Sequence, residues 1–395
     1  MLLKYSVQNY KCFQEKETIS FKAKKISENS NKQYSLLKND ILPIISIYGP
    51  NGGGKTSLIE SISVLKDIVS NGKILDARII NMLKNQNQQT EDIKWEIEFI
   101  EPDETIYVYK LNFGEEITFE SLYKNKKLIF ERNKEKIEFS LADIPNSSIK
   151  KENISHKSSI LLFLDSLFNN LDIGMVMGEF RKIKYLDTAK DITVNTSIFG
   201  APFLDVGYVE ILEKDKDKFL KIFKELDINI INLEFHKNPI NPNMINIISV
   251  KKNDFGKEFK IHLRAESKGT IKLIHLMTYF IQGLHNQEIF IIDELDSALH
   301  TNLLKYIIKL FNSHTFNKGS QLIYTSHDIS TLNKENFRRD QIYFCAMNES
   351  YFSNVISLKD IGARNDDVFS KQYLEGKYGY DPYIDFSLKA FNEKK

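Results

Sequence analysis

The stretch GPNGGGKT at residues 49–56 constrains this chain more than any other feature of its sequence. It fits the phosphate-loop pattern GxxxxGK[ST] and follows ILPIISI, residues 41–47, an apolar run that predicts a buried strand. A helix is expected directly afterwards, with one apolar face formed by Leu58, Ile59, Ile62 and Leu65. A strand, a glycine loop and a helix in this order predict a phosphate-binding loop within an α/β fold.

The chemistry of this loop accounts for each of its residue types. Glycines allow backbone N–H groups to turn inward onto phosphates, and the N-terminus of the following helix adds its positive end. Lys55 is expected to reach the β- and γ-phosphates of ATP, and Thr56 is expected to bind Mg²⁺. A glycine-rich turn without a ligand is the alternative, but it gives no reason for the Lys and the Thr. The predicted ATP-binding residues of this segment are Gly49, Pro50, Asn51, Gly52, Gly53, Gly54, Lys55, Thr56 and Ser57.

An acidic landmark lies far downstream in IFIIDELDSALH. Its apolar residues 289–292 predict a buried strand that delivers Asp293 and Glu294 to its C-terminal end, where ligands bind in open α/β sheets. Asp293 is suited to the Mg²⁺ shell, and Glu294 is suited to polarise an attacking water as general base. An apolar strand that ends in two acids is commonly only a solvated strand end. A phosphate loop in the same chain favours the catalytic interpretation.

Two further segments gain meaning beside these motifs. QLIYTSH ends in His327, and a single histidine at a strand end is more often structural than functional. If its strand lies beside that of Asp293, His327 would face the γ-phosphate and sense it by hydrogen bonding. RAESKGTIKLIHL places Ser267, Gly269 and Thr270 at the start of a helix, where an ordinary helix cap is the simpler interpretation.

Composition argues against several other classes of protein. Lys plus Arg total 54 and Asp plus Glu total 53, so the formal net charge is +1 and no global charge favours nucleic acid or a membrane. Cys12 and Cys345 lack metal-binding spacing, which argues against a disulfide framework or structural zinc and favours the reducing cytoplasm. We expect no membrane association, since no long uncharged apolar run occurs. No arrangement for serine, cysteine or glycosidase chemistry stands out.

Hydrophobic periodicity predicts an α/β fold with a mixed, largely parallel core sheet, an antiparallel β subdomain and a helical insertion. Short strands are expected at 2–8 and 17–22, and an antiparallel meander from 93 to 140. The expected division is an N-terminal lobe at 1–140, a mostly helical insertion at 141–235, a C-terminal lobe at 236–360 and a tail packed on the core at 361–395.

The phosphate loop, ESKGT, FIIDELDSALH and YTSH, in this order, resemble the ABC-type ATPase heads of the SMC, RecF and OLD-like proteins. Among these, the chain looks most like the compact ATPases of bacterial phage-defence and abortive-infection cassettes. The similarity extends over nearly the whole chain. The opening contains the family's Asn-aromatic-basic element at Asn9, Tyr10 and Lys11, and SKQYLEGKYGYDPYI is similar to its C-terminal tract. The resemblance implies an ABC-ATPase head that binds and hydrolyses ATP with Mg²⁺.

The resemblance also implies roles for particular residues. Ser267 and Gly269 correspond to the ABC signature, and Asp296 corresponds to the D-loop. His327 corresponds to the switch histidine, and Lys11 to a nucleotide-binding position. In such heads two subunits pair head to tail, so that the signature helix of one caps the nucleotide held by the other. A homodimer or a higher even-numbered homo-oligomer, closed by ATP and reopened by hydrolysis, is therefore implied.

The chain departs from the family pattern in several places. Its signature is SKGT rather than Ser-Gly-Gly-Gln, and Thr301 stands where relatives often have Pro. Gln86, Gln88 and Gln89 lie in a plausible region for a Q-loop, without a secure strand before them. No sustained heptad array indicates a coiled-coil arm. About seventy residues follow His327, too few for an added nuclease domain of ordinary size, so a separate effector protein is expected.

Three functions follow from these patterns. The first is an ABC-type ATPase switch that closes as a homodimer around ATP and gates a separate effector in anti-phage defence. The second is a RecF-like repair ATPase with nucleic acid as its ligand, for which YKNKKLIFERNKEKIEF and FRKIKY supply basic residues. The third is a nucleotide-gated, non-catalytic scaffold that holds a toxin or a sensor.

Overall fold

A computed structural model of the chain describes residues 1–25, 36–133, 136–140, 155–168, 170–187, 206–237, 245–364 and 367–380. Parts of each of the four predicted divisions fall outside these residues. The longest are the stretches 141–154 and 188–205 of the expected helical insertion, and the end of the tail from residue 381. Within the described residues the strands form three sheets, of seven, three and six strands.

The six-stranded sheet is the core of the molecule, and it is parallel except for β16 at one edge. Its four central strands are almost entirely buried, as expected where helices cover both faces of a parallel sheet. The order across the sheet is β16 (Ser353–Ser357), β15 (Ile342–Met347), β3 (Ile44–Tyr48), β14 (Gln321–Thr325), β13 (Ile289–Asp293) and β9 (Ile183–Asp187).

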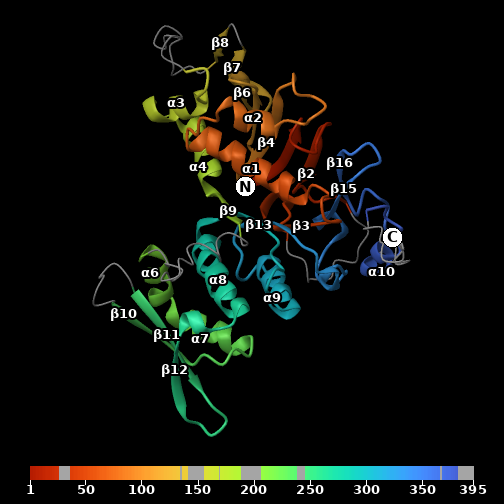
Figure 1. Cartoon of the computed structure of the whole chain (residues 1–395). Helices are drawn as coiled ribbons and strands as arrows, with labels where there is room; N and C mark the ends of the chain where they lie inside the picture. Colours follow the sequence, from red (N-terminus) through yellow and green to blue (C-terminus); the bar gives the residue numbers. More distant parts are fainter. Residues whose placement is uncertain are drawn as a thin grey trace, which may run out of the picture.

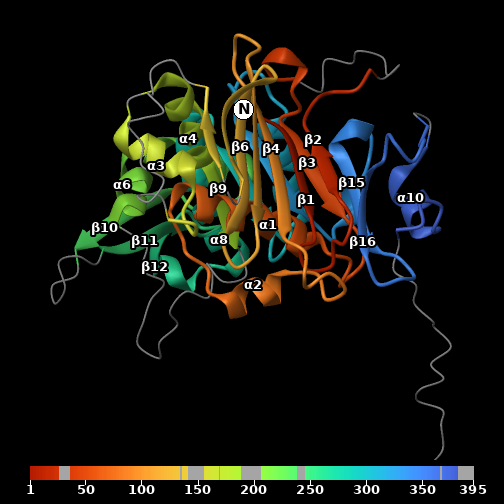
Figure 2. The same cartoon turned by 90° about the horizontal axis from the view of Figure 1, so that it is seen from above.

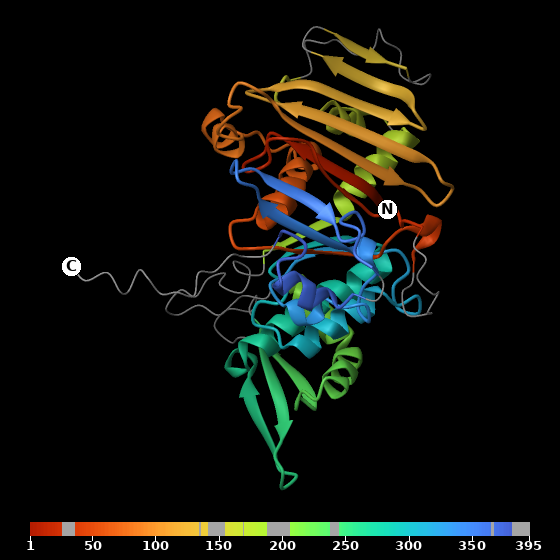
Figure 3. The same cartoon turned by 90° about the vertical axis from the view of Figure 1, so that its right-hand side faces the viewer.

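The seven-stranded sheet is antiparallel throughout and lies above the core in Figure 3. It confirms the predicted meander and adds the two N-terminal strands to one edge. Buried and partly exposed residues alternate along Ile93–Ile100 and Ile106–Phe113, because one face of these strands packs on the protein interior. Its order is β2 (Glu17–Ser20), β1 (Leu2–Gln8), β4 (Ile93–Ile100), β5 (Ile106–Phe113), β6 (Ile117–Lys124), β7 (Lys127–Asn133) and β8 (Ile137–Phe139).

Two hydrophobic clusters lie on opposite faces of the core sheet. The first fills the space between the two large sheets, where it contains residues of α1 (Lys55–Ser70), α3 (Ile160–Leu167) and α4 (Leu171–Lys182) (Figure 2). The second lies beneath the core sheet in Figure 1. Its helices are α6 (Val206–Lys214), α7 (Lys216–Glu225), α8 (Lys268–Asn286), α9 (Thr301–Phe311) and α10 (Phe369–Leu374).

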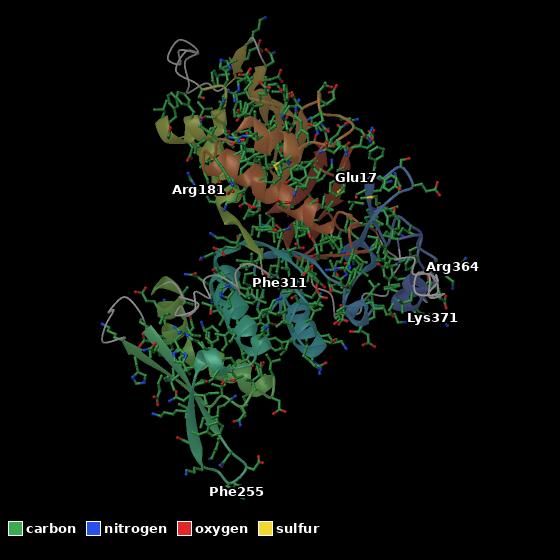
Figure 4. All side chains as sticks on the ribbon, in the orientation of Figure 1. Glu17, Arg181, Phe255, Phe311, Arg364 and Lys371 are labelled. Atoms are coloured by element: carbon green, nitrogen blue, oxygen red, sulfur yellow. The ribbon has the colours of Figure 1, made fainter. Side chains whose placement is uncertain are left out.

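A small antiparallel sheet extends away from the core beside α6 and α7 (Figure 3). It consists of β10 (Asn232–Lys237), β11 (Ile245–Lys252) and β12 (Glu258–His262). Leu233 and Ile247 are buried and belong to the second cluster, so its base packs on the molecule. Phe255, in the turn between β11 and β12, is 95% exposed at the far end of the molecule (Figure 4).

The region expected to be mostly helical also contains strand β9, which the sequence analysis missed. Residues 183–187 pair in parallel with β13, from Ile183 opposite Ile289 to Asp187 opposite Asp293. The short segment IKYLD gives little local signal for a strand, since its apolar residues are few and its partner strand lies far away in sequence. The helices before it, α3 and α4, bury Leu164, Met177 and Phe180 in the first cluster, as a cover for the sheets requires.

No single helix among the described residues is long and apolar enough to cross a membrane. Helices α3 and α4 reach that threshold only as a pair bent by 118°. The described part of the C-terminal tail packs on the core, where the ring of Tyr373 stacks on Phe344 of β15 with centroids 5.2 Å apart.

Candidate functional site

The glycine loop connects the end of β3 to the start of α1, as predicted. Gly49 has a φ of 147°, and a Cβ there would overlap the carbonyl oxygen of Cys345 on β15. Gly54, at the N-cap of α1, has a φ of 99°, in the left-handed region that favours glycine. A side chain at either position would strain the backbone or push the loop away from the sheet. The loop is therefore shaped to keep its backbone in close contact with β15.

Lys55 is the first residue of α1, and its side chain returns across the loop. Its ammonium donates to the carbonyl oxygens of Gly49 at 2.8 Å and Pro50 at 2.9 Å. Only 6% of the residue is exposed, and burial lowers the pKa of Lys55, while the negative charges of groups that include Asp293 and Glu294 oppose the shift. A partly desolvated ammonium held by two loop carbonyls is suited to exchange these carbonyls for phosphate oxygens.

Strand β13 ends at Asp293, and the chain turns sharply at Glu294, whose φ is 47°. Thr325, at the end of the neighbouring strand β14, orients both residues. Its hydroxyl donates to Asp293 Oδ1 at 2.5 Å and accepts the backbone N–H of Glu294 at 2.8 Å. The sequence analysis did not select Thr325, because its role follows from the pairing of β13 with β14.

The glycine loop and the two acids face one cavity of about 270 Å³. The parallel strands β3, β13 and β14 end at the same edge of the core sheet, which is why segments from both halves of the chain meet there. The cavity also receives two residues from the N-terminal turn. The residues that line it are Lys11, Cys12, Asn51, Gly52, Gly53, Gly54, Lys55, Thr56, Ser57, Asp293, Glu294, Thr325 and His327.

Lys11 reaches this cavity from a turn that is fixed by hydrogen bonds. Its φ is 47°, its backbone N–H donates to Leu83 at 2.7 Å, and its carbonyl accepts from the side chain of Asn85 at 2.7 Å. The Lys11 ammonium forms an ion pair with Glu60 of α1. Cys12, which the sequence analysis did not select, lines the cavity next to it.

The predicted signature residues are placed elsewhere. Ser267 is exposed and caps α8, where its hydroxyl accepts the backbone N–H of Thr270 at 3.1 Å. Gly269 lies in the first turn of α8, and a Cβ there would be 2.7 Å from the carbonyl oxygen of Ala298. Neither Ser267 nor Gly269 lines the cavity of its own chain.

The turn after β13 links the remaining predicted residues. Asp296 Oδ2 accepts the backbone N–H of His327 at 2.9 Å, and His327 is exposed at the cavity. Asp296 does not line the cavity. Lys272 of α8 lies beneath the turn and is fully buried, and burial lowers its pKa to about 8, against the opposing charges of Asp296 and Glu294. The sequence offered no reason to single out this lysine among the others.

The oxygen donors at the cavity fit a magnesium ion that shares its shell with phosphates. Thr56 offers a hydroxyl and Asp293 a carboxylate, and Mg²⁺ prefers such hard ligands together with waters and substrate phosphates. Among the described residues, no group of three or more His, Cys, Asp or Glu side chains could hold a metal ion without further ligands. The donor set therefore suits a metal that arrives with its nucleotide. Of the three glutamines considered for a Q-loop, none lines the cavity.

A glycine loop of this sequence, placed between a core strand and the helix that follows it, defines a P-loop nucleotide-binding protein. Residues 44–333 match the family described as "AAA domain, putative AbiEii toxin, Type IV TA system", and the chain belongs to this family. The expectation of a P-loop ATPase domain, similar to those of abortive-infection systems, is thus confirmed at the level of the family.

Among solved structures, the chain is similar to the SMC head domain from Thermotoga maritima. The match has 15% sequence identity and a TM-score of 0.42, and it covers 90% of this chain and 98% of that one. No curated protein matches the chain.

Proposed function

We propose that this protein is an ATP-hydrolysing switch that closes as a head-to-tail homodimer around ATP and gates a separate effector. The observation that carries the proposal is the single cavity that joins the glycine loop, Asp293, Glu294 and His327. A phosphate loop alone would fit any nucleotide-binding protein. A paired carboxylate at the same cavity also supplies the means to activate a water.

Each residue has a role that its position supports. Lys55 would exchange the loop carbonyls for the β- and γ-phosphates, and Thr56 with Asp293 would hold Mg²⁺. When bound, the metal would neutralise charge on the phosphates. Glu294 would accept a proton from the attacking water, and His327 would contact the γ-phosphate.

The location of Ser267 supports the dimer. An exposed helix N-terminus is a favourable place for an anion. The N-terminus of α8, at Ser267, is exposed on the surface of the chain and does not line the chain's own cavity. In a head-to-tail pair, the α8 N-terminus of one subunit would complete the phosphate site of the other. ATP would then belong to the interface, so its binding would favour closure by mass action.

The proposed gating role rests on the family to which the chain belongs. The family description includes an AbiEii-type toxin and a type IV toxin–antitoxin system, which favours a function in abortive infection and anti-phage defence over general metabolism. We propose that the closed dimer controls a toxic or nucleolytic partner. Expression of the chain with its neighbouring genes should lower phage plating efficiency, and Lys55→Ala should abolish that effect.

The decisive experiment measures mass by light scattering, with and without ATP and Mg²⁺. Glu294→Gln should bind ATP and form a stable dimer, because loss of a general base costs a factor of about 10² to 10⁴ in rate. Adding Ser267→Arg should prevent the dimer without preventing ATP binding. Thr315→Arg is the matched control. Thr315 is exposed and lies between α9 and β14, near the N-terminal ends of the core strands, whereas the cavity lies at their C-terminal ends. An ATP-bound monomer of Glu294→Gln would contradict the proposal.

DNA is less favoured as the principal ligand, because five of the basic side chains expected to bind it form ion pairs with acidic residues of the same chain. Lys124 pairs with Asp172 at 2.7 Å, and Arg132 is buried against Glu120 at 2.9 Å. In FRKIKY, Arg181 pairs with Asp165 at 2.5 Å, and the two lysines form ion pairs with Glu179 and Glu288. The scaffold hypothesis is also less favoured, because the carboxylates needed for hydrolysis lie at the nucleotide cavity.

A further inference from the structure

Lys272 is a buried lysine to which the proposed mechanism gives no role. It lies on the buried face of α8, five positions after Ser267, and has no exposed surface. A buried ammonium is costly unless charges and hydrogen bonds compensate it, so its surroundings must supply both. Here they are supplied by the turn that follows β13.

The ammonium of Lys272 donates to two backbone carbonyls of that turn. The acceptors are the oxygen of Glu294 at 3.1 Å and the oxygen of Ser297 at 2.5 Å. The carboxylate of Asp296 adds the larger of the two compensating charges, and its Oδ1 is buried without a hydrogen-bond partner among the described residues. The lysine is thus placed at the centre of the turn that carries the general base.

The turn itself requires this kind of support. Glu294 and Ala298 both have left-handed φ angles, of 47° and 59°, which are unfavourable for residues other than glycine. The first turn of α8 meets the same segment a second time, where Gly269 approaches the carbonyl of Ala298 so closely that a Cβ would be 2.7 Å from it. Two contacts therefore join the N-terminus of α8 to the turn as one rigid unit.

We propose that Lys272 is a positioning residue that couples the two nucleotide sites of the closed dimer. This inference rests on the proposed function. In a head-to-tail pair, Ser267 acts on the partner's nucleotide, while Glu294 of the same chain acts on its own. Lys272 connects the helix that carries Ser267 to the backbone of Glu294. Capping of one ATP thereby fixes the general base at the other, so that hydrolysis is cooperative and confined to the fully closed dimer.

The test compares Lys272→Met with the wild type in steady-state turnover as a function of ATP concentration. Wild type should show a Hill coefficient above 1, with two as the limit for two sites. In Lys272→Met we expect the coefficient to fall to about 1 and turnover to fall roughly 10- to 100-fold, as for a misplaced catalytic group. Lys272→Arg keeps the charge and the donors and should restore part of both.

Thr278→Val provides the control within the same helix. Thr278 is also buried on α8, and its hydroxyl donates to the carbonyl of Ile274 within the same helix at 2.8 Å, so its loss should leave the Hill coefficient unchanged. A Hill coefficient of 1 in the wild type, or an unchanged coefficient in Lys272→Met, would overturn the coupling. Absence of any ATP-dependent dimer in Glu294→Gln would instead refute the proposed function itself.

A measurement without substitution at Lys272 covers the case in which Lys272→Met fails to fold. Hydrogen exchange is measured on Glu294→Gln in two segments, residues 268–272 and residues 294–298. The protein concentration is kept low, so that dimerisation needs a higher ATP concentration than ATP binding does. With coupling, residues 268–272 and 294–298 become protected at the same ATP concentration. Two separate midpoints, with the turn protected first, would show that α8 and the turn respond independently and would overturn the inference.

Discussion

Thr325→Val tests whether one hydroxyl organises both acidic residues of the cavity. Thr325 is fully buried, and valine has nearly its shape but cannot hydrogen bond. The substitution removes a bond to the Asp293 carboxylate, worth roughly 1.5 to 3 kcal/mol, and leaves the Glu294 N–H without its acceptor, at a cost of about 1 to 3 kcal/mol. Because such terms are not additive, we expect a loss of about 3 to 4 kcal/mol.

Urea unfolding and ATP turnover together check this prediction. For a slope of about 3 kcal/mol per molar, the midpoint should fall by roughly 1 M. Turnover should fall by about tenfold to a hundredfold, since Glu294 loses the bond that fixes its backbone. Thr325→Ser keeps the hydroxyl and should cost only about 1 kcal/mol for the lost methyl group. Equal midpoints and equal turnover for the valine and serine variants would refute the reasoning.

Two other predictions concern the loop and the sheet edge. Gly49→Ala should abolish ATP binding in equilibrium titrations, because its Cβ would overlap the carbonyl of Cys345. Gly52 has open space around it and a φ of 76°, so Gly52→Ala should reduce the free energy of ATP binding by only about 1 kcal/mol. Equal affinities would refute this. Burial raises the pKa of Glu17, which accepts the Val355 N–H at 2.8 Å, to about 7. The folded state therefore binds a proton that the unfolded state releases, and this stabilisation is lost as pH rises from about 4.5 to 7. Glu17→Gln should raise the melting temperature at pH 8 and not at pH 4.5, and an equal difference at both pH values would contradict it.

Most of the helices and strands could be predicted because their patterns are local. The alternation in IKWEIEFI gives β4, and the spacing of Leu58, Ile62 and Leu65 gives the buried face of α1. Strand β9 could not be found in this way. Its five residues pair with β13, which lies about a hundred positions further along the chain, and only that partner makes an extended conformation favourable.

The residues of the candidate site likewise include some that local motifs predict and others that only the fold brings to the cavity. The glycine loop, Asp293, Glu294 and His327 were selected from motifs, and the structure places all of them at one cavity, although their chemical roles stay predictions. Cys12 and Thr325 line it too and belong to no recognisable pattern. Their positions depend on where the fold places the N-terminal turn and the end of β14. Both belong to sheets whose strands are distant from one another in sequence.

The phosphate loop and the two acids at a strand end could be recognised from the amino-acid sequence, because each motif is contiguous and its backbone conformation follows from its own residues. Which side chains share a cavity, and which lie apart from it, depends on the packing of the whole fold. Parallel pairing of β3, β14 and β13 brings residues from opposite ends of the chain to one sheet edge. The same packing buries Lys272 under the turn of Glu294, where its ammonium must bond to the carbonyls around it.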